Sequence, residues 1–398
     1  MRRQIAWLLP WALVACVTDG AKYRIRPDGP LLAGREAWVS ATRSAPARRV
    51  NVVLLVADDL GYADVGAMGR PGPRIATPNL DALAAQGVTF EQGYVTSPLC
   101  SPSRAGLLTG RYQQRFGHEG QPHDRYAKNA LEFFVFEHFV AGGEWQLERR
   151  VAPDAEDVRR QGLPVGELTL ADLLKRHGYA TGVVGKWHLG AGHDFQPRQR
   201  GFDEHYGVYE AYTLYADPPD RGDVVNVKHG DFSERFIWGK GRSGTAAVRR
   251  DDVVVEEPGY LTTRFADEAV AFIDKHRAEP FFLYVPFTAP HTPFQALKTD
   301  VAKFEGEPDE NRRVYLALVA SLDEAVGRVV KAIDERGLGG ETLVVFMSDN
   351  GGALYTGATT NAPFKGGKFT LFEGGIRVPM MARLPGRLPA GLRYAQPV

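Results

Sequence analysis

The sequence contains only two cysteines, Cys16 and Cys100, among its 398 residues. Two cysteines supply at most one disulfide, so the fold cannot depend on a disulfide framework. A zinc site built from clustered cysteine and histidine is not indicated either, because no such cluster is present. If Cys16 is modified, Cys100 has no partner, and a lone cysteine in an oxidising compartment needs a chemical role.

An excess of charge of one sign is also lacking. Lys plus Arg and Asp plus Glu each total 48, which gives a formal net charge of zero. No long run of either sign interrupts this balance, so we expect no nucleic-acid partner. An anionic substrate must therefore be held by local positive charge and not by the field of the whole protein.

Long apolar runs are absent as well. The apolar stretch near the N-terminus, 5–14, is interrupted by Pro10, whereas a spanning helix needs about 20 apolar residues. Because Arg2 and Arg3 precede this short stretch, the pattern is typical of a signal peptide. We therefore predict a signal peptide at 1–16 and an exported protein.

The end of this stretch, Leu13-Val14-Ala15-Cys16, resembles a bacterial lipoprotein box, in which the cysteine is lipidated. Cleavage near Ala15 that leaves a free Cys16 is the alternative. The following residues, 17–49, show no clear periodicity and are expected to be a tether. The prediction is a periplasmic or cell-surface protein, attached to the membrane where Cys16 carries lipid.

Short apolar runs alternate with helical patterns along the rest of the chain. Each run is bounded by turn or charged residues, which is typical of buried strands. This alternation predicts an α/β fold with a mostly parallel central sheet sandwiched by helices. The predicted strands are 52–56, 181–184, 281–287, 343–347 and 379–383, and the predicted helices are 79–86, 168–177, 261–276 and 312–336.

The segment 120–160 does not fit the alternation. It contains the aromatic run 131–136 and Trp145 in polar surroundings. One interpretation is a surface insertion that packs its own aromatic side chains, and the other is a lid or subsite near a catalytic pocket.

Polar clusters follow four of the predicted strands. Ligands of open α/β sheets bind beyond the carboxyl ends of the strands, so clusters at these ends are expected to converge. The clusters are Asp58-Asp59, Lys186-Trp187-His188, His291 and Asp349-Asn350.

Asp58, Asp59, Asp349 and Asn350 offer only oxygen ligands. Such a set suits a hard cation, calcium or magnesium. Taken alone, Asp58-Asp59 and Asp349-Asn350 are each also common in turns. It is their joint placement at one edge of the sheet that predicts a metal site.

Cys100 begins the segment Cys-Ser-Pro-Ser-Arg-Ala-Gly-Leu-Leu-Thr-Gly-Arg at 100–111. Pro102 is expected to start a helix that ends near Gly110. Cys100 then lies at a helix N-terminus, where exposed N–H groups favour anions. The residues alone leave open an inert buried thiol and a thiolate nucleophile.

The pattern Cys-x-Pro-Ser-Arg-x-x-x-Leu-Thr-Gly at 100–110 resembles the sulfatase motif, whose cysteine is converted to Cα-formylglycine by a dedicated maturation enzyme. Other segments resemble the same family in order and spacing. They are 58–62, 185–190, 290–293, 348–352 and 366–379. The resemblance implies an arylsulfatase-like enzyme of bacterial exported type, with the alkaline phosphatase-like fold.

The resemblance implies that the protein hydrolyses sulfate esters. Residue 100, as hydrated formylglycine, would be the nucleophile, and it would bind a divalent metal, calcium or else magnesium. The other implied metal ligands are Asp58, Asp59, Asp349 and Asn350.

Five further roles are carried over with the resemblance. Arg104 would hold the hydrated aldehyde, and Lys186 and Lys368 would bind sulfate oxygens. His291 would protonate the departing alcohol with help from Lys368. His188 would remove the proton of the second hydroxyl, which expels sulfate and regenerates the aldehyde.

The implied substrate is a sulfated small molecule or polysaccharide. Two alternatives remain: a phosphomonoester or phosphonate hydrolase of the same superfamily, and a non-catalytic binder of sulfated glycans. The catalytic domain is expected at 50–398, with 120–160 as an insertion. Because sulfatases continue into a small C-terminal subdomain, the expectation is that this subdomain is truncated or absent here.

Overall fold

The computed structural model describes residues 49–68, 77–122, 130–135, 162–229, 234, 237–239 and 241–398. The predicted signal peptide, the lipoprotein box with Cys16 and nearly all of the tether lie outside the described residues. Within 120–160, the described residues are 120–122 and the short helix α5 (Ala130–Val135). None of the helices in these ranges is long and apolar enough to cross a membrane.

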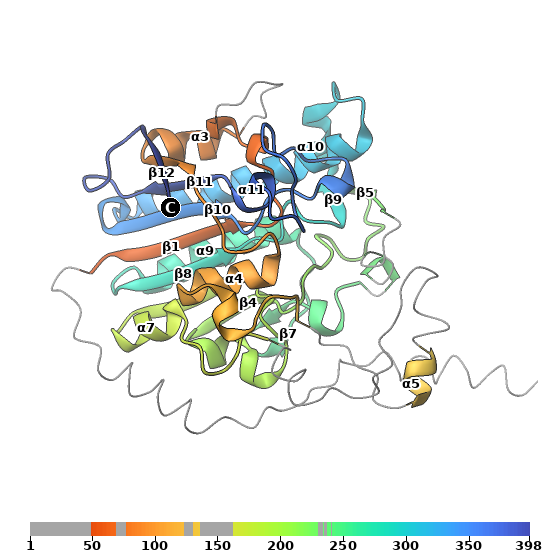
Figure 1. Cartoon of the computed structure of the whole chain (residues 1–398), viewed down its shortest axis with the longest axis horizontal. Helices are drawn as coiled ribbons and strands as arrows, with labels where there is room; N and C mark the ends of the chain where they lie inside the picture. Colours follow the sequence, from red (N-terminus) through yellow and green to blue (C-terminus); the bar gives the residue numbers. More distant parts are fainter. Residues whose placement is uncertain are drawn as a thin grey trace, which may run out of the picture.

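A ten-stranded sheet forms the centre of the molecule, and helices cover both of its faces (Figure 1). The five middle strands are parallel, which confirms the predicted α/β fold with a mostly parallel sheet. In spatial order the strands are β12 (Leu392–Pro397), β2 (Val88–Gln92), β11 (Met380–Arg383), β10 (Thr342–Ser348), β1 (Asn51–Ala57), β8 (Phe281–Pro286), β3 (Ala180–Lys186), β4 (Glu204–Val208), β6 (Arg249–Arg250) and β7 (Val253–Val254). A separate antiparallel pair joins β5 (Val224–Val227) to β9 (Phe294–Leu297).

All of the predicted strands and helices are present, with ends that differ by at most two residues. The strand predicted at 379–383 is β11, which runs antiparallel to β10. The main helices are α3 (Pro78–Ala85), α4 (Cys100–Thr109), α7 (Leu170–Arg176), α9 (Leu261–His276) and α11 (Glu310–Glu335), with short α10 (Lys298–Val301) and α12 (Glu373–Ile376).

Strand β1 divides the core into two layers because its side chains alternate between the faces of the sheet. Val53 and Leu55 pack in the larger apolar cluster with residues of α9 and α11. Leu54 and Val56 pack in the second cluster with residues of α4 and α7. The central strand is thus buried on both sides, which explains its continuous apolar sequence.

The carboxyl ends of the parallel strands lie at one edge of the sheet. In the parallel pairing of β1 with β10, Ala57 lies opposite Ser348. The end of β3 approaches β8 closely because Gly185 has φ +137° and no side chain; a Cβ there would come within 2.0 Å of the Pro286 carbonyl oxygen. These two pairings bring the polar residues that follow the strands together.

The two-sided burial of β1 predicts a large cost for removing a side chain there. Leu55→Ala should lower the free energy of unfolding by about 2–5 kcal/mol, since Leu55 has no exposed surface. Leu371→Ala is the matched control, because Leu371 is 78% exposed, and its effect should stay within about 0.5 kcal/mol. Urea denaturation followed by fluorescence measures both; equal midpoints for the two variants would contradict this account of the core.

Candidate active site

The site begins where β1 ends. Asp58 and Asp59 follow the strand directly, and Asp59 adopts φ +61°, which turns the chain sharply. The backbone N–H of Asp59 donates to Oδ1 of Asp349 at 3.2 Å, and the N–H of Leu60 donates to Ser348 Oγ at 3.0 Å. The acidic turn after β1 is therefore fixed to the end of β10.

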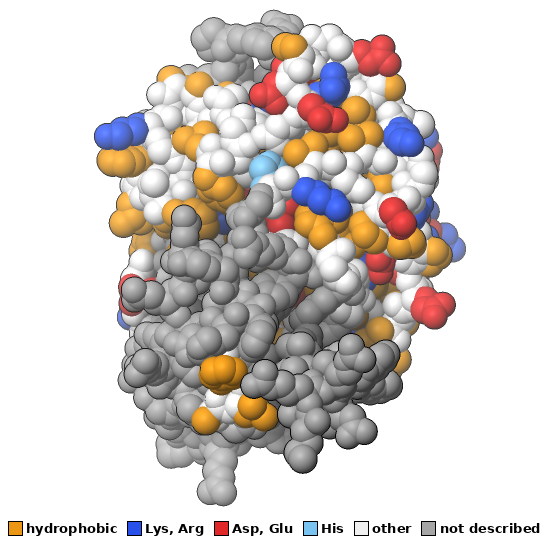
Figure 2. Space-filling view, turned by 90° about the vertical axis from the view of Figure 1, so that its right-hand side faces the viewer, with side chains coloured by type: hydrophobic (Ala, Val, Ile, Leu, Met, Phe, Trp, Pro, Cys, Tyr) orange, Lys and Arg blue, Asp and Glu red, His pale blue; other side chains and the backbone are white. Residues whose placement is uncertain are grey.

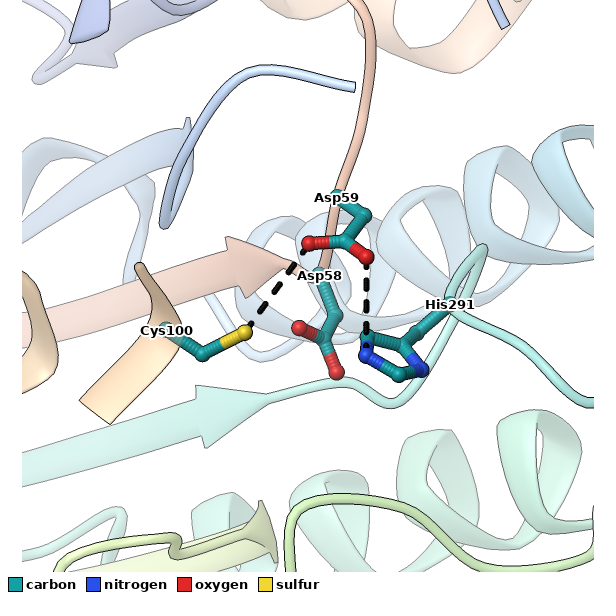
Figure 3. A group of neighbouring side chains, drawn as sticks. All are labelled: Asp58, Asp59, Cys100 and His291. Carbon is teal, nitrogen blue, oxygen red and sulfur yellow. Dashed lines mark hydrogen bonds and ion pairs between the residues drawn. The ribbon is translucent and has the colours of Figure 1, made fainter. Parts of the chain in front are cut away.

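Cys100 is the first residue of α4, as the position of Pro102 predicted. Its side chain is buried, with Sγ 3.9 Å from Oδ1 of Asp59. Figure 3 shows Cys100, Asp58, Asp59 and His291 pointing toward one another from three segments. One potential ligand atom from each of the four lies within 4.8 Å of the others.

Buried carboxylates and buried cations are paired around this point. Lys186 Nζ lies 2.6 Å from Oδ2 of Asp58. Lys368 Nζ lies 2.8 Å from Oδ2 of Asp59. A buried charge needs such a partner, because the loss of hydration is otherwise too costly.

Arg104 completes this set of charges from the second turn of α4. Its Nε and NH2 atoms lie 2.9 and 2.8 Å from Oδ2 of Asp349, and its NH1 donates to the Lys186 carbonyl at 2.8 Å. The same guanidinium lies 3.4 Å from Oδ1 of Asp58. Arg104 thus joins the ends of three strands through side chains that have no exposed surface.

The two neighbouring aspartates differ in acidity. Burial raises the pKa of Asp58 to about 7, against the attraction of Lys186. Burial also opposes ionisation of Asp59, but the attraction of Lys368 outweighs it and holds the pKa of Asp59 below its ordinary range. Asp59 is therefore the firmly ionised member of the pair.

Both predicted histidines are held as neutral imidazoles. Burial and Lys368 keep the pKa of His291 well below its usual value, and burial and Lys186 do the same for the pKa of His188. His291 Nε2 lies 2.9 Å from Lys368 Nζ and 3.5 Å from Oδ2 of Asp59. Among the described residues, Nδ1 of His188 has no hydrogen-bond partner.

Two buried oxygens fit a cation. Among the described residues, Oδ1 of Asp58 and Oδ1 of Asn350 receive no hydrogen bond. The Asn350 amide nitrogen donates to Asp59 Oδ1 at 2.7 Å, and Asp58 places a carboxylate oxygen within 4.8 Å of one from Asp59. Buried oxygens without hydrogen bonds are costly, and a hard cation with oxygen ligands would satisfy them.

The structure thus brings every predicted site residue to this edge of the sheet, but two differ in surroundings from what was expected. Both oxygens of Asp349 are already engaged, by Arg104 and by the Asp59 N–H. Arg104 faces the carboxylates of Asp58 and Asp349, whereas the family resemblance implied that it holds residue 100. The residues at the site are Asp58, Asp59, Cys100, Arg104, Lys186, His188, His291, Asp349, Asn350 and Lys368.

Asn361 is a site residue that the sequence did not reveal. Its Oδ1 accepts the N–H of Gly352 at 2.8 Å, and its Nδ2 donates to the carbonyls of Gly352 and Gly366 at 3.0 and 3.1 Å. The N–H of Lys368 also donates to the Gly352 carbonyl, at 3.1 Å. Asn361 therefore fixes the loop of Lys368 to the loop that follows Asn350.

Tyr212 is a second residue beside the site that the sequence did not reveal. Its ring stacks on His291, with ring centroids 6.2 Å apart and an angle of 7° between the planes. It lies outside every recognisable motif, so only the fold brings it beside the histidine.

Comparisons with known proteins agree with this geometry. Residues 50–398 match the family model described as Sulfatase. The N-acetylgalactosamine-6-sulfatase of Sus scrofa is 36% identical over 347 residues, which cover 86% of this chain and 58% of that protein. The steryl-sulfatase of Mus musculus is 34% identical over an aligned length of 444 residues, gaps included. The alignment covers 94% of this chain and 65% of that protein.

A solved structure is also similar to this chain in sequence and fold. The crystal structure of Ps i-CgsB in complex with k-i-k-neocarrahexaose is 35% identical, with a TM-score of 0.70, covering 88% of this chain and 69% of that chain. The chain spans less than two thirds of the length of the curated relatives named above. Since the family model matches the chain from residue 50 to its last residue, this protein belongs to the sulfatase family.

Proposed function

We propose that this chain hydrolyses sulfate esters of carbohydrates. The observation that carries the proposal is the buried meeting of Cys100 with the Asp59 carboxylate and the Lys368 ammonium. Two relatives have sugar ligands or substrates in their names, an N-acetylgalactosamine-6-sulfatase and a neocarrahexaose complex. This supports a sulfated saccharide over other sulfate esters.

The surroundings of Cys100 fit a precursor of formylglycine better than a thiolate nucleophile. Burial raises the pKa of its thiol to about 12, so the thiolate is scarce at neutral pH. His291 also has a ring nitrogen within 4.8 Å of the thiol, but its Nε2 already contacts Lys368. Conversion by a maturation enzyme to formylglycine, whose hydrate carries two hydroxyls, would supply an oxygen nucleophile at the same position.

The charges of the site favour a doubly negative ligand once a divalent cation is bound. Asp58, Asp59 and Asp349 balance Arg104, Lys186 and Lys368 within the protein. Calcium would therefore add two unbalanced positive charges. A sulfate ester and an ionised nucleophile carry one negative charge each, and released sulfate carries two. Asp58, Asp59, Asp349 and Asn350 would hold the cation, and it would polarise sulfate oxygens and lower the pKa of the attacking hydroxyl.

Proton transfer is assigned to groups whose protonation states suit it. Lys368 keeps its proton, since Asp59 outweighs burial and raises the pKa of the ammonium well above its usual value. Its Nζ lies 2.9 Å from His291 Nε2, and protonation of the departing alcohol is assigned to His291 with Lys368 beside it. His188 is neutral and can accept the proton of the second hydroxyl. Lys186 and Lys368 stabilise charge on sulfate oxygens.

Arg104 acts mainly as a positioning residue in this proposal. Its guanidinium holds Asp349 and the Lys186 carbonyl in place. The role expected from the family resemblance, contact with the hydrated aldehyde, is compatible with its place one turn after residue 100 on α4. Export and lipidation of Cys16 remain part of the same proposal, because an exported enzyme would meet sulfated polysaccharides outside the cell.

Activity on two test esters checks the function. Protein produced together with a formylglycine-generating enzyme should hydrolyse p-nitrophenyl sulfate faster than p-nitrophenyl phosphate. Cys100→Ala should lower kcat by about 10⁴-fold or more, because the nucleophile is lost. Faster turnover of the phosphate would favour the phosphohydrolase alternative, and no turnover of either ester by the matured protein would favour the non-catalytic binder.

Cation binding can be measured apart from activity. Calcium at 100 times its Kd should stabilise the protein by about 2.7 kcal/mol, seen as a higher thermal midpoint. Magnesium at equal concentration should have a smaller effect. Calcium is the larger ion and accepts several protein oxygens as ligands, whereas magnesium usually keeps several of its waters. Asp58→Asn should remove most of the calcium response. Asp274→Asn, which changes an aspartate on the surface, should keep the full response. A calcium shift that is absent, or equal in both variants, contradicts the site.

The raised pKa of Cys100 predicts an unreactive thiol in unmatured protein. At pH 8 only about one thiol in 10⁴ is ionised when the pKa is about 12. Iodoacetamide should therefore leave residue 100 unlabelled in the native protein and label it fully after denaturation in urea. Rapid labelling of the native protein, measured by peptide mass spectrometry, would show that Cys100 is a thiolate.

A further inference from the structure

Large exposed hydrophobic side chains gather in the segment 354–372, beside the site. Tyr355 is 55% exposed and Phe369 is 60% exposed. Their ring centroids lie 5.8 Å apart, and the ring planes make an angle of 35°. Figure 2 looks onto the side of the molecule where β1 ends, and hydrophobic side chains are prominent among the described residues of that face. Exposed apolar patches of this kind mark binding sites for ligands or partners.

The conformation of Phe369 makes this exposure more informative. Its φ is +71°, in the left-handed region that favours glycine and asparagine. A bulky residue in such a conformation costs about 1–3 kcal/mol and is held there by its surroundings. Here the N–H of Phe369 donates to the Pro98 carbonyl at 3.0 Å, and the N–H of Thr370 donates to the Gly367 carbonyl at 3.0 Å. The turn thus holds an aromatic ring in water at a position whose backbone conformation favours glycine or asparagine.

The same turn joins the ring pair to the catalytic groups. Lys368 Nζ lies 5.5 Å from the centroid of the Phe369 ring. It is also 2.8 Å from Oδ2 of Asp59 and 2.9 Å from His291 Nε2. The Pro98 carbonyl that holds Phe369 lies two residues before Cys100. The Phe369 ring of the aromatic pair is therefore adjacent to the Lys368 ammonium, which is proposed to bind sulfate.

We propose that Tyr355 and Phe369 form a platform on which a pyranose ring of the sulfated saccharide stacks. The proposal rests on the proposed function. The axial C–H groups of a pyranose form a flat apolar face that fits an aromatic ring, while its hydroxyl groups stay in water at the edge. The platform lies beside Lys368, so a ring stacked there keeps its ester oxygen near the site. The aromatic pair thus selects cyclic alcohols over acyclic ones.

The test compares three sulfate esters with matured, full-length protein. Phe369→Asn removes the ring and keeps a residue that tolerates positive φ; Tyr355→Ala is the second variant. With N-acetylgalactosamine 6-sulfate, each should lower kcat/KM about tenfold, mainly through KM, as expected for the loss of about 1.4 kcal/mol of binding. With butyl sulfate the change should stay below about twofold. The control is Leu371→Ala, which removes a nearby exposed side chain and should leave all rates within about twofold.

Each other result has a defined meaning. An equal loss on all three esters, or no loss on the sugar sulfate, overturns the platform. A loss confined to p-nitrophenyl sulfate, the third ester, also overturns it, because the platform would then bind arenes. The proposal is likewise wrong if Phe369→Asn abolishes self-association of the protein and leaves the sugar sulfate rate unchanged.

Failure of the proposed function gives a different pattern, since matured wild-type protein would then hydrolyse none of the three esters. Calorimetric titration of Cys100→Ala with N-acetylgalactosamine 6-sulfate tests the platform without turnover. An about tenfold weaker Kd after adding Phe369→Asn supports the platform. An unchanged Kd overturns it.

Discussion

Lys186 and Arg104 both face Asp58 in a part of the protein without exposed surface, and Lys368 faces Asp59 beside them. Removing one partner from such a buried ion pair typically costs about 3–5 kcal/mol, because the other charge is left unpaired. The pairs also fix geometry, since their members come from different segments: Asp58 and Asp59 follow β1, Lys186 ends β3, and Arg104 lies on α4. The ends of β1, β3 and β10 are thus held together by the same charges that are proposed to act on the substrate.

This arrangement explains why the two histidines stay neutral. Burial and the nearby lysines disfavour a second positive charge on either imidazole, so His188 and His291 carry no charge at neutral pH. The protonated group is instead Lys368, which contacts both Asp59 and His291. One lysine thereby connects the carboxylate cluster, the proposed proton path and, through the next residue, the aromatic platform.

The sequence predicted the central strands well because they are buried on both faces and read as continuous apolar runs. It missed β4 (Glu204–Val208), whose five residues include His205 and Gly207 and form no apolar run. The site residues were found because they follow strands or belong to family motifs. Asn361 and the Tyr355–Phe369 pair were not found, since their roles depend on backbone groups and rings that only the fold brings together.

The most direct test of the account is the mass of the peptide that contains residue 100, from protein produced together with a formylglycine-generating enzyme. The account predicts the loss of mass that accompanies replacement of the thiol by an aldehyde, and reaction of that peptide with a carbonyl-specific hydrazide. A peptide that keeps the mass of unmodified Cys100, from protein that nevertheless hydrolyses sulfate esters, would contradict the central claim that the cysteine is a precursor of the nucleophile.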